Sequence, residues 1–169
     1  GVFQMHRWEL GYGRRSLEIA RGLDDPGTLV TVLVNHGVYH TGNGDWSSAR
    51  EVLEEGRSIA ERLGDHTQWG ECTAVLADAA QLEGDLARSG ALYGELAASA
   101  ERRGNAVQVG WSLRPRVLEA LRSGDAQRAI DILTHAMPAL HAAPDALIKF
   151  DAHGLLALAQ ARTGDPTAA

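Results

Sequence analysis

Aspartate or asparagine recurs every twenty residues along this 169-residue chain. The series comprises Asp25, Asp45, Asp65, Asp85, Asn105, Asp125, Asp145 and Asp165. Glycine stands just before six of these eight positions, namely Gly44, Gly64, Gly84, Gly104, Gly124 and Gly164. A fixed period of this length indicates a stacked-repeat architecture, in which each unit buries its apolar face against its neighbours.

Each Gly-Asp step has the composition of a junction between two helices. Glycine just past the end of a helix adopts the left-handed conformation without Cβ strain. The aspartate that follows can accept hydrogen bonds from the free N–H groups of the next helix. Pro26 and Pro166 follow two of these aspartates, at the first helical position, where proline is tolerated. We therefore expect one helix of roughly 17 residues per unit, with successive helices antiparallel.

Units forty residues apart resemble one another more than consecutive units do. Ala49 and Leu53 correspond to Ala129 and Leu133, which lie eighty residues later in the sequence. Both pairs belong to an apolar face with helical spacing. The sequence thus predicts an all-α protein of about seven helices, built from helix pairs (A, then B) with a forty-residue period. The expected array comprises an unpaired B-type helix in 1–24, helix pairs in 25–64, 65–104 and 105–144, and an A-type helix with a stub in 145–169.

The first complete pair carries a pattern of small and bulky residues. In order, these are Gly37, Gly44-Asp45-Trp46, Ala49, Leu53 and Gly56. This pattern resembles the tetratricopeptide repeat, although that family has a shorter period of about 34 residues. The resemblance implies a right-handed α-solenoid. In it, a small residue of helix A lets helix B approach, and the A helices line a concave groove.

The repeat length and the Ala-, Gly- and Arg-rich composition also resemble the C-terminal arrays of large bacterial ATP-binding LuxR-type transcription regulators of the STAND class. This resemblance implies a cytoplasmic fragment of a larger regulator. Its role would be that of a non-catalytic scaffold that binds a protein or peptide. A small-molecule effector domain of such a regulator is the alternative. The single Cys72 excludes an internal disulfide framework and fits a reducing compartment.

The tetratricopeptide register implies which side chains line the groove. The candidate ligand-binding residues are Trp111, Arg114, Arg122, Glu71, Asp78 and Asp151. Tryptophan and arginine are enriched at binding hot spots, so we expect an acidic or amphipathic peptide, or an anionic effector. The competing interpretation is structural: Trp111 is partly packed, and the arginines pair with Asp78 or Asp151. Pro115 and Pro138 each lie inside an expected helix and should kink it.

Other classes of function find little support. The net charge of −6 argues against direct nucleic-acid contact by this segment, and no apolar run has the ~20 residues of a membrane span. The chain has no phosphate loop, nucleophile elbow or pair of acids in a plausible cleft, so we expect no enzyme and no cofactor. His36 and His40 lie four residues apart but have no obvious third ligand, which favours core histidines over a metal site.

Three further expectations concern packing. Glu54 and Glu55 should form ion pairs three or four residues away within their own helix. Helix-interior glycines such as Gly56, Gly90 and Gly94 should mark close helix approach. The end helices lack partners and should expose apolar surface, giving self-association through Leu155, Leu156 and Leu158 or through Trp8 and Leu10.

Overall fold

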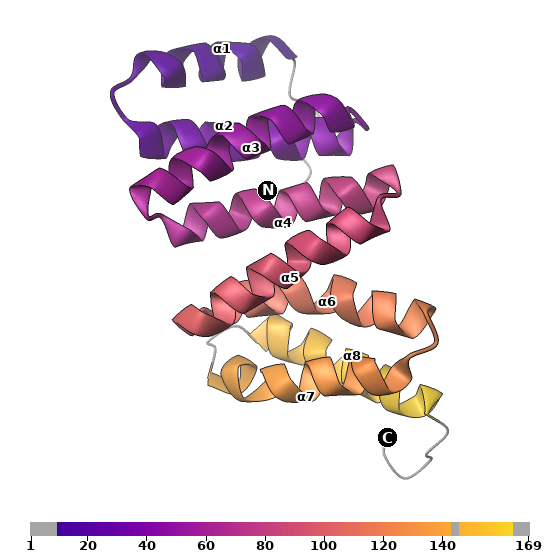
Figure 1. Ribbon diagram of the computed structural model, residues 1–169. Helices are drawn as coiled ribbons and strands as arrows, with labels where there is room; N and C mark the ends of the chain where they lie inside the picture. The colour runs from indigo at the N-terminus through magenta and orange to yellow at the C-terminus, as the bar shows by residue number, and fades with distance from the viewer. Residues whose placement is uncertain (1–9, 143–145, 164–169) are drawn as a thin grey trace. The chain divides into compact units, whose positions relative to one another are not determined.

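The computed structural model describes residues 10–142 and 146–163, with side chains described for 13–142 and 149–163. The described part of the chain is all-helical and contains no strand (Figure 1). Its helices are α1 (Leu10–Gly22), α2 (Pro26–Gly42), α3 (Trp46–Leu63), α4 (His66–Glu83), α5 (Leu86–Arg103), α6 (Ala106–Arg122), α7 (Ala126–Ala142) and α8 (Ala146–Arg162). The expected all-α helical repeat is confirmed. The described residues form eight helices rather than about seven, because both end segments add one to the three pairs. None of these helices is long and apolar enough to cross a membrane.

One junction shows how the twenty-residue period arises. Gly64 ends α3 in the left-handed conformation, with φ of 67°. The backbone N–H of Asp65 then donates to the Ala60 carbonyl at 2.9 Å, which closes the end of α3. The Asp65 carboxylate accepts from the backbone N–H groups of Thr67 and Gln68 at 3.1 and 3.0 Å, which caps the start of α4. Asp65 therefore ends one helix through its N–H group and begins the next through its side chain.

The other described junctions follow the same plan. Glycines in the left-handed region precede the caps at Gly44, Gly84, Gly104 and Gly124. Capping side chains accept from backbone N–H groups at Asp25, Asp45, Asp85, Asn105 and Asp125. Hydrogen bonds from Thr28 lower the pKa of Asp25, and hydrogen bonds from Ser48 lower the pKa of Asp45, as expected for carboxylates that act as caps. The predicted breaks at Asp145 and Asp165 lie outside the described residues.

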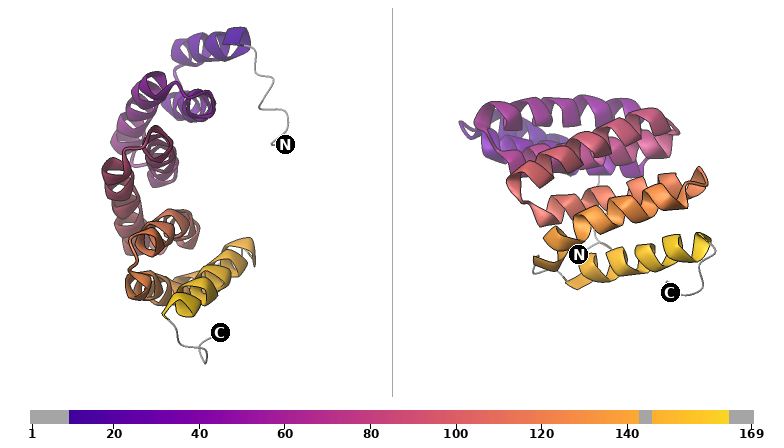
Figure 2. Two further views of the ribbon diagram at one scale, coloured as in Figure 1. Left: turned by 90° about the vertical axis from the view of Figure 1, so that its right-hand side faces the viewer. Right: turned by 60° about the horizontal axis from the view of Figure 1, so that its bottom comes forward.

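The chain forms two compact units, Gly1–Leu92 and Tyr93–Ala169, with the boundary inside α5. In the first unit, the B-type helix α3 packs against the A-type helices α2 and α4, which also contact each other. In the second unit, α7 packs in the same way against α6 and α8. Within each unit, consecutive A-type helices therefore lie side by side and a B-type helix covers them, as the end-on view of Figure 2 shows for α2, α3 and α4.

Two glycines of the tetratricopeptide-like pattern lie where helices approach closely. A Cβ atom on Gly37 of α2 would overlap the side chain of Leu53 on α3. A Cβ on Gly56 would lie 3.1 Å from the Cys72 sulfur and 3.3 Å from Cβ of Leu33. Both positions therefore let a bulky neighbour approach the helix backbone, as the pattern predicts. Burial raises the pKa of the Cys72 thiol to about 12, which disfavours its thiolate form.

The expectation that Gly90 and Gly94 mark close approach between helices is wrong. A Cβ on Gly90 or Gly94 would meet no described atom within 4 Å, and both glycines are exposed on α5. The presence of a glycine inside a helix therefore did not identify a contact. Only Gly37 and Gly56, which also belong to the repeat pattern, mark close approach among these four.

Candidate binding surface

Three of the predicted site residues lie along one face of α6. Trp111, Arg114 and Arg122 are separated by three and eight residues, and these spacings bring side chains to the same side of a helix. The side chain of Trp111 retains 40% of its exposure, which is high for so large an apolar group. Arg114 and Arg122 are exposed as well. We call this surface, together with Asp151 and Leu158 on α8, the A face of the second unit.

Arg114 forms an ion pair with Asp151, which joins α6 to α8. The Nη1 group of Arg114 donates to Oδ1 of Asp151. The structural interpretation of Arg114 is therefore confirmed. However, the two side chains keep 58% and 45% of their exposure, so water still reaches the pair. Exposed pairs of this kind contribute about 0–1 kcal/mol to stability, which leaves the arginine available to a better acceptor.

Arg122 is the last residue of α6 and forms no ion pair with any residue that the structure describes. The neighbouring carbonyl, that of Leu121, accepts a hydrogen bond at 3.3 Å from Nη1 of Arg162 on α8. Arg162 thus adds a side-chain donor to a carbonyl that also accepts from the backbone N–H of Gly124 at 3.3 Å. Arg162 therefore links α8 to the end of α6, whereas the exposed guanidinium of Arg122 forms no ion pair within the described part of the chain.

Pro115 lies inside α6, next to Arg114 of the A face. Proline has no N–H group, so the carbonyl four residues before it, that of Trp111, lacks its usual intrahelical donor. The predicted kinks at Pro115 and Pro138 stay predictions. The helices nevertheless continue past both prolines, since α6 and α7 extend to residues 122 and 142.

Leucines of α8 divide between the core and the surface. Leu155 is 6% exposed and packs into the core of the second unit, so the expectation that it offers open apolar surface is wrong. Leu156 is partly buried against the same core, whereas Leu158 is 41% exposed. The side chains of Trp8 and Leu10, the other expected contacts, lie outside the described part of the structure.

The remaining predicted residues, Glu71 and Asp78, lie seven residues apart on one face of α4, in the first unit. Burial raises the pKa of Glu71, and the nearby Asp65 carboxylate adds to the effect. A cationic neighbour would reverse this shift, so Glu71 favours a positively charged partner group. Asp78 is exposed. Of the six predicted residues, Arg114 and Asp151 contact each other.

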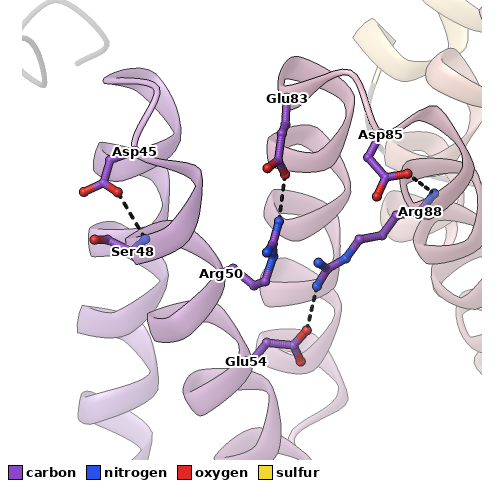
Figure 3. A network of polar contacts seen from close by, with 7 residues as sticks. All are labelled: Asp45, Ser48, Arg50, Glu54, Glu83, Asp85 and Arg88. Carbon is purple, nitrogen blue, oxygen red and sulfur yellow. Dashed lines mark hydrogen bonds and ion pairs between the residues drawn. The ribbon is translucent and has the colours of Figure 1, made fainter.

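On the B-type helices, the acidic and basic residues pair differently from the expectation. Glu54 accepts from Arg88 of α5 at 3.1 Å, and Arg50 donates to Glu83 of α4 at 2.7 Å (Figure 3). Glu55 pairs with Arg21 of α1 at 2.7 Å. These pairs join different helices, 33 or 34 residues apart, so the prediction of intrahelical partners for Glu54 and Glu55 is wrong.

The histidines near the start of the chain are accounted for by packing. His36 is buried, and its Nε2 donates to the Gly13 carbonyl at 2.7 Å. Burial lowers its pKa, which favours the neutral imidazole over the charged form. Nδ1 of His40 lies 3.1 Å from the Asp45 carboxylate. Within the described residues, no group of three or more His, Cys, Asp or Glu side chains is placed to hold a metal ion.

Sequence reasoning missed two contacts of aromatic side chains. The guanidinium of Arg57 lies 4.9 Å from the ring centroid of Trp69, a cation–π contact between α3 and α4. His141 and His153 meet between α7 and α8, with their Nε2 atoms 3.3 Å apart. Both contacts join residues twelve apart in sequence, a separation that neither helical periodicity nor the forty-residue repeat singles out.

Comparison with known proteins adds no family assignment: the chain matches no protein-family model, and it matches no curated protein sequence.

Proposed function

We propose that this chain is a non-catalytic binding scaffold whose A face in the second unit binds an acidic or amphipathic peptide segment of a partner protein. The observation that carries this proposal is the exposed indole of Trp111, one turn from the exposed guanidinium of Arg114 on the same face of α6. A large apolar ring beside a cation is the combination typical of interface hot spots.

The ion pair with Asp151 orients Arg114 before a ligand arrives. A carboxylate of the ligand can take a second position on the same guanidinium or replace Asp151. Because the pair is exposed, this exchange costs little. Trp111 and Leu158, which are both exposed, offer apolar contact beside the pair.

The spacing of the two arginines specifies the ligand further. Arg114 and Arg122 are eight residues apart, which is roughly 12 Å along a helix. In an extended peptide, two acidic residues about four positions apart span a similar length. We therefore expect a peptide with acidic residues at that spacing and an apolar or aromatic residue near the one that binds Arg114.

In its wider context, we propose that the scaffold is the sensor or regulatory repeat region of a larger bacterial regulator of transcription or signalling, and that it works in the cytoplasm. The support is the tetratricopeptide-like register, in which Gly37 receives Leu53, together with the repeat length. Sequencing the complete reading frame tests this context. A nucleotide-binding domain or a helix-turn-helix beside the repeats is the expected result, and a secreted or membrane enzyme would contradict it.

The binding proposal is tested with a displayed peptide library and single variants. Peptides selected for binding to the wild-type chain should contain two acidic residues about four positions apart. Trp111→Ala, Arg114→Ala and Arg122→Ala should each weaken their binding by ~1–3 kcal/mol. Arg128→Ala is the matched control, because Arg128 is 54% exposed and pairs with Glu119 at 3.1 Å, but lies on the B-type helix α7.

Equal losses in Arg128→Ala and Arg114→Ala would mean that charge alone governs binding, and would contradict a specific A face. A thermal-shift screen with small anionic metabolites distinguishes the alternative. A shift that Arg114→Ala abolishes, without selection of any peptide, would identify the A face as an effector site.

A further inference from the structure

A pair of histidines outside the A face has an unusual geometry. His141 lies in the last turn of α7 and His153 near the middle of α8. Their Nε2 atoms are 3.3 Å apart, their ring centroids are 5.5 Å apart, and their planes differ by 26°. Since the centroids are much farther apart than the nitrogens, the rings meet edge to edge through Nε2 and do not stack face to face.

The distance between the two nitrogens is compatible with two kinds of contact. An N–H···O hydrogen bond brings the heavy atoms to about 2.7–3.2 Å, and an N–H···N bond is slightly longer, so one ring can donate to the other when only one of the two nitrogens carries a proton. Two imidazole nitrogens bound to one tetrahedral metal ion at about 2.0–2.1 Å leave roughly 3.3–3.4 Å between them. The observed 3.3 Å therefore also fits two ligands of one metal ion, without any change in the separation of the two nitrogens. A small rotation of each ring then directs both nitrogen lone pairs at one point.

The surroundings determine which ion fits. Both imidazoles are exposed, so water can complete the coordination sphere. No group of three or more metal-binding side chains exists among the described residues, which therefore supply two ligands here. Imidazole nitrogen suits zinc, copper and nickel and is a poor ligand for magnesium or calcium. We propose that His141 and His153 bind one divalent transition-metal ion, such as Zn²⁺, with water as the remaining ligands.

The other histidine contacts lack this geometry. His36 already donates Nε2 to the Gly13 carbonyl, and its ring centroid lies 6.2 Å from that of His40. Nε2 of His135 lies 3.8 Å from the Glu101 carboxylate, and His135 is strongly exposed. A metal ion held by His141 and His153 would also tie α7 to α8 and so stabilise the second unit by mass action.

The test is Zn²⁺ titration of the tag-free chain by calorimetry, with His141→Gln, His153→Gln and the control His66→Gln, which removes an exposed imidazole from α4. We expect one Zn²⁺ per wild-type chain. We also expect a loss of affinity of at least about tenfold in each of the first two variants and no loss in the control. Zn²⁺ should raise the melting temperature of the wild type and of His66→Gln, but not that of His141→Gln or His153→Gln.

Equal affinity in all four proteins, or no binding by the wild type at millimolar Zn²⁺, overturns the proposal. A second readout does not depend on the variants. Electron paramagnetic resonance of the wild type with one equivalent of Cu²⁺ should show two equivalent nitrogen ligands. A spectrum with one nitrogen or none would overturn the proposal even if a variant failed to fold.

Discussion

At the scale of single residues, the fold depends on which glycines face a neighbour. Gly37 and Gly90 both lie inside helices, but a Cβ on Gly37 would overlap Leu53, whereas a Cβ on Gly90 would meet no described atom within 4 Å. The same substitution by alanine therefore has opposite consequences at the two sites. Alanine favours the helix at both, and at Gly37 the gain is outweighed by overpacking.

Gly37→Ala is expected to lower the free energy of unfolding by ~1–3 kcal/mol, because Leu53 must leave its position. Gly90→Ala, the matched control, should raise it by about 0.5–1 kcal/mol through backbone entropy. Urea unfolding followed by circular dichroism measures both. Adding Leu53→Val to Gly37→Ala should recover part of the loss. If Gly37→Ala left the free energy of unfolding unchanged, α2 and α3 would not pack as closely as the structure describes.

His36 should make stability depend on pH. Burial lowers its pKa, while the unfolded chain protonates the imidazole near its ordinary value of 6.5. The neutral His36 therefore makes its full contribution to the free energy of unfolding above about pH 6.5. This contribution is lost as the pH falls from about 6.5 through the pKa of His36 in the folded state. Urea midpoints at pH 7.5 and 5.5 should differ more in the wild type than in His36→Gln, which keeps a donor for the Gly13 carbonyl. An equal pH response in both proteins would refute this role.

At the scale of helices, each Gly-Asp junction specifies one end and one start. The repeat itself contains a natural experiment, because Asn105 replaces aspartate and still accepts from the backbone N–H of Gln108 at 3.2 Å. The carboxylate charge is therefore dispensable for the cap geometry, and the side-chain oxygen is what the junction requires.

Asp65→Ala should lower the free energy of unfolding by about 1 kcal/mol, because the N–H groups of Thr67 and Gln68 lose their acceptor. Asp65→Asn should be nearly neutral, as the natural Asn105 junction indicates. Thermal unfolding of the two variants beside the wild type measures the difference. If asparagine were as damaging as alanine, the charge and not the hydrogen bond would be the stabilising element.

The B-type helices show what the sequence could have revealed about their ion pairs. The pair of Arg21 with Glu55 recurs two repeats later as Glu101 with His135, at a distance of 3.8 Å and with the acidic and basic partners exchanged. The two positions are eighty residues apart, so the forty-residue period relates them. Comparing charges 33 or 34 residues apart, and not at the i,i+4 spacing of a single helix, would have identified contacts between helices.

At the scale of the whole chain, the two compact units should respond independently to local damage. Contacts in a repeat protein join neighbouring helices, so a defect propagates poorly along the array. In Gly37→Ala, amide exchange should accelerate in α2 and α3 and stay at the wild-type rate in α7 and α8. Hydrogen exchange with mass spectrometry measures this by segment. Uniform acceleration would show a single cooperative unit.

The fold was more predictable from the sequence than the binding surface. The junctions are local, because Gly64 and Asp65 need only their own backbone to act, and the packing of Gly37 on Leu53 follows from the repeat pattern. The pairing of Arg114 with Asp151 was one of two stated options, since both Asp78 and Asp151 were candidate partners. The contact of His141 with His153 depends on how two helices cross, which no local pattern encodes.

The short junctions between helices restrict where ligand-binding residues can lie. Many proteins keep a rigid scaffold and vary their loops to acquire new ligands. Here one aspartate both closes a helix and opens the next, so the described connections offer almost no residue for insertion. New specificity in such a chain has to come from substitutions on the helix faces, or from duplication of a complete forty-residue block. Sequences descended from a common ancestor should accordingly differ in the number of their repeats and in face residues such as Trp111, and agree in the lengths of their turns.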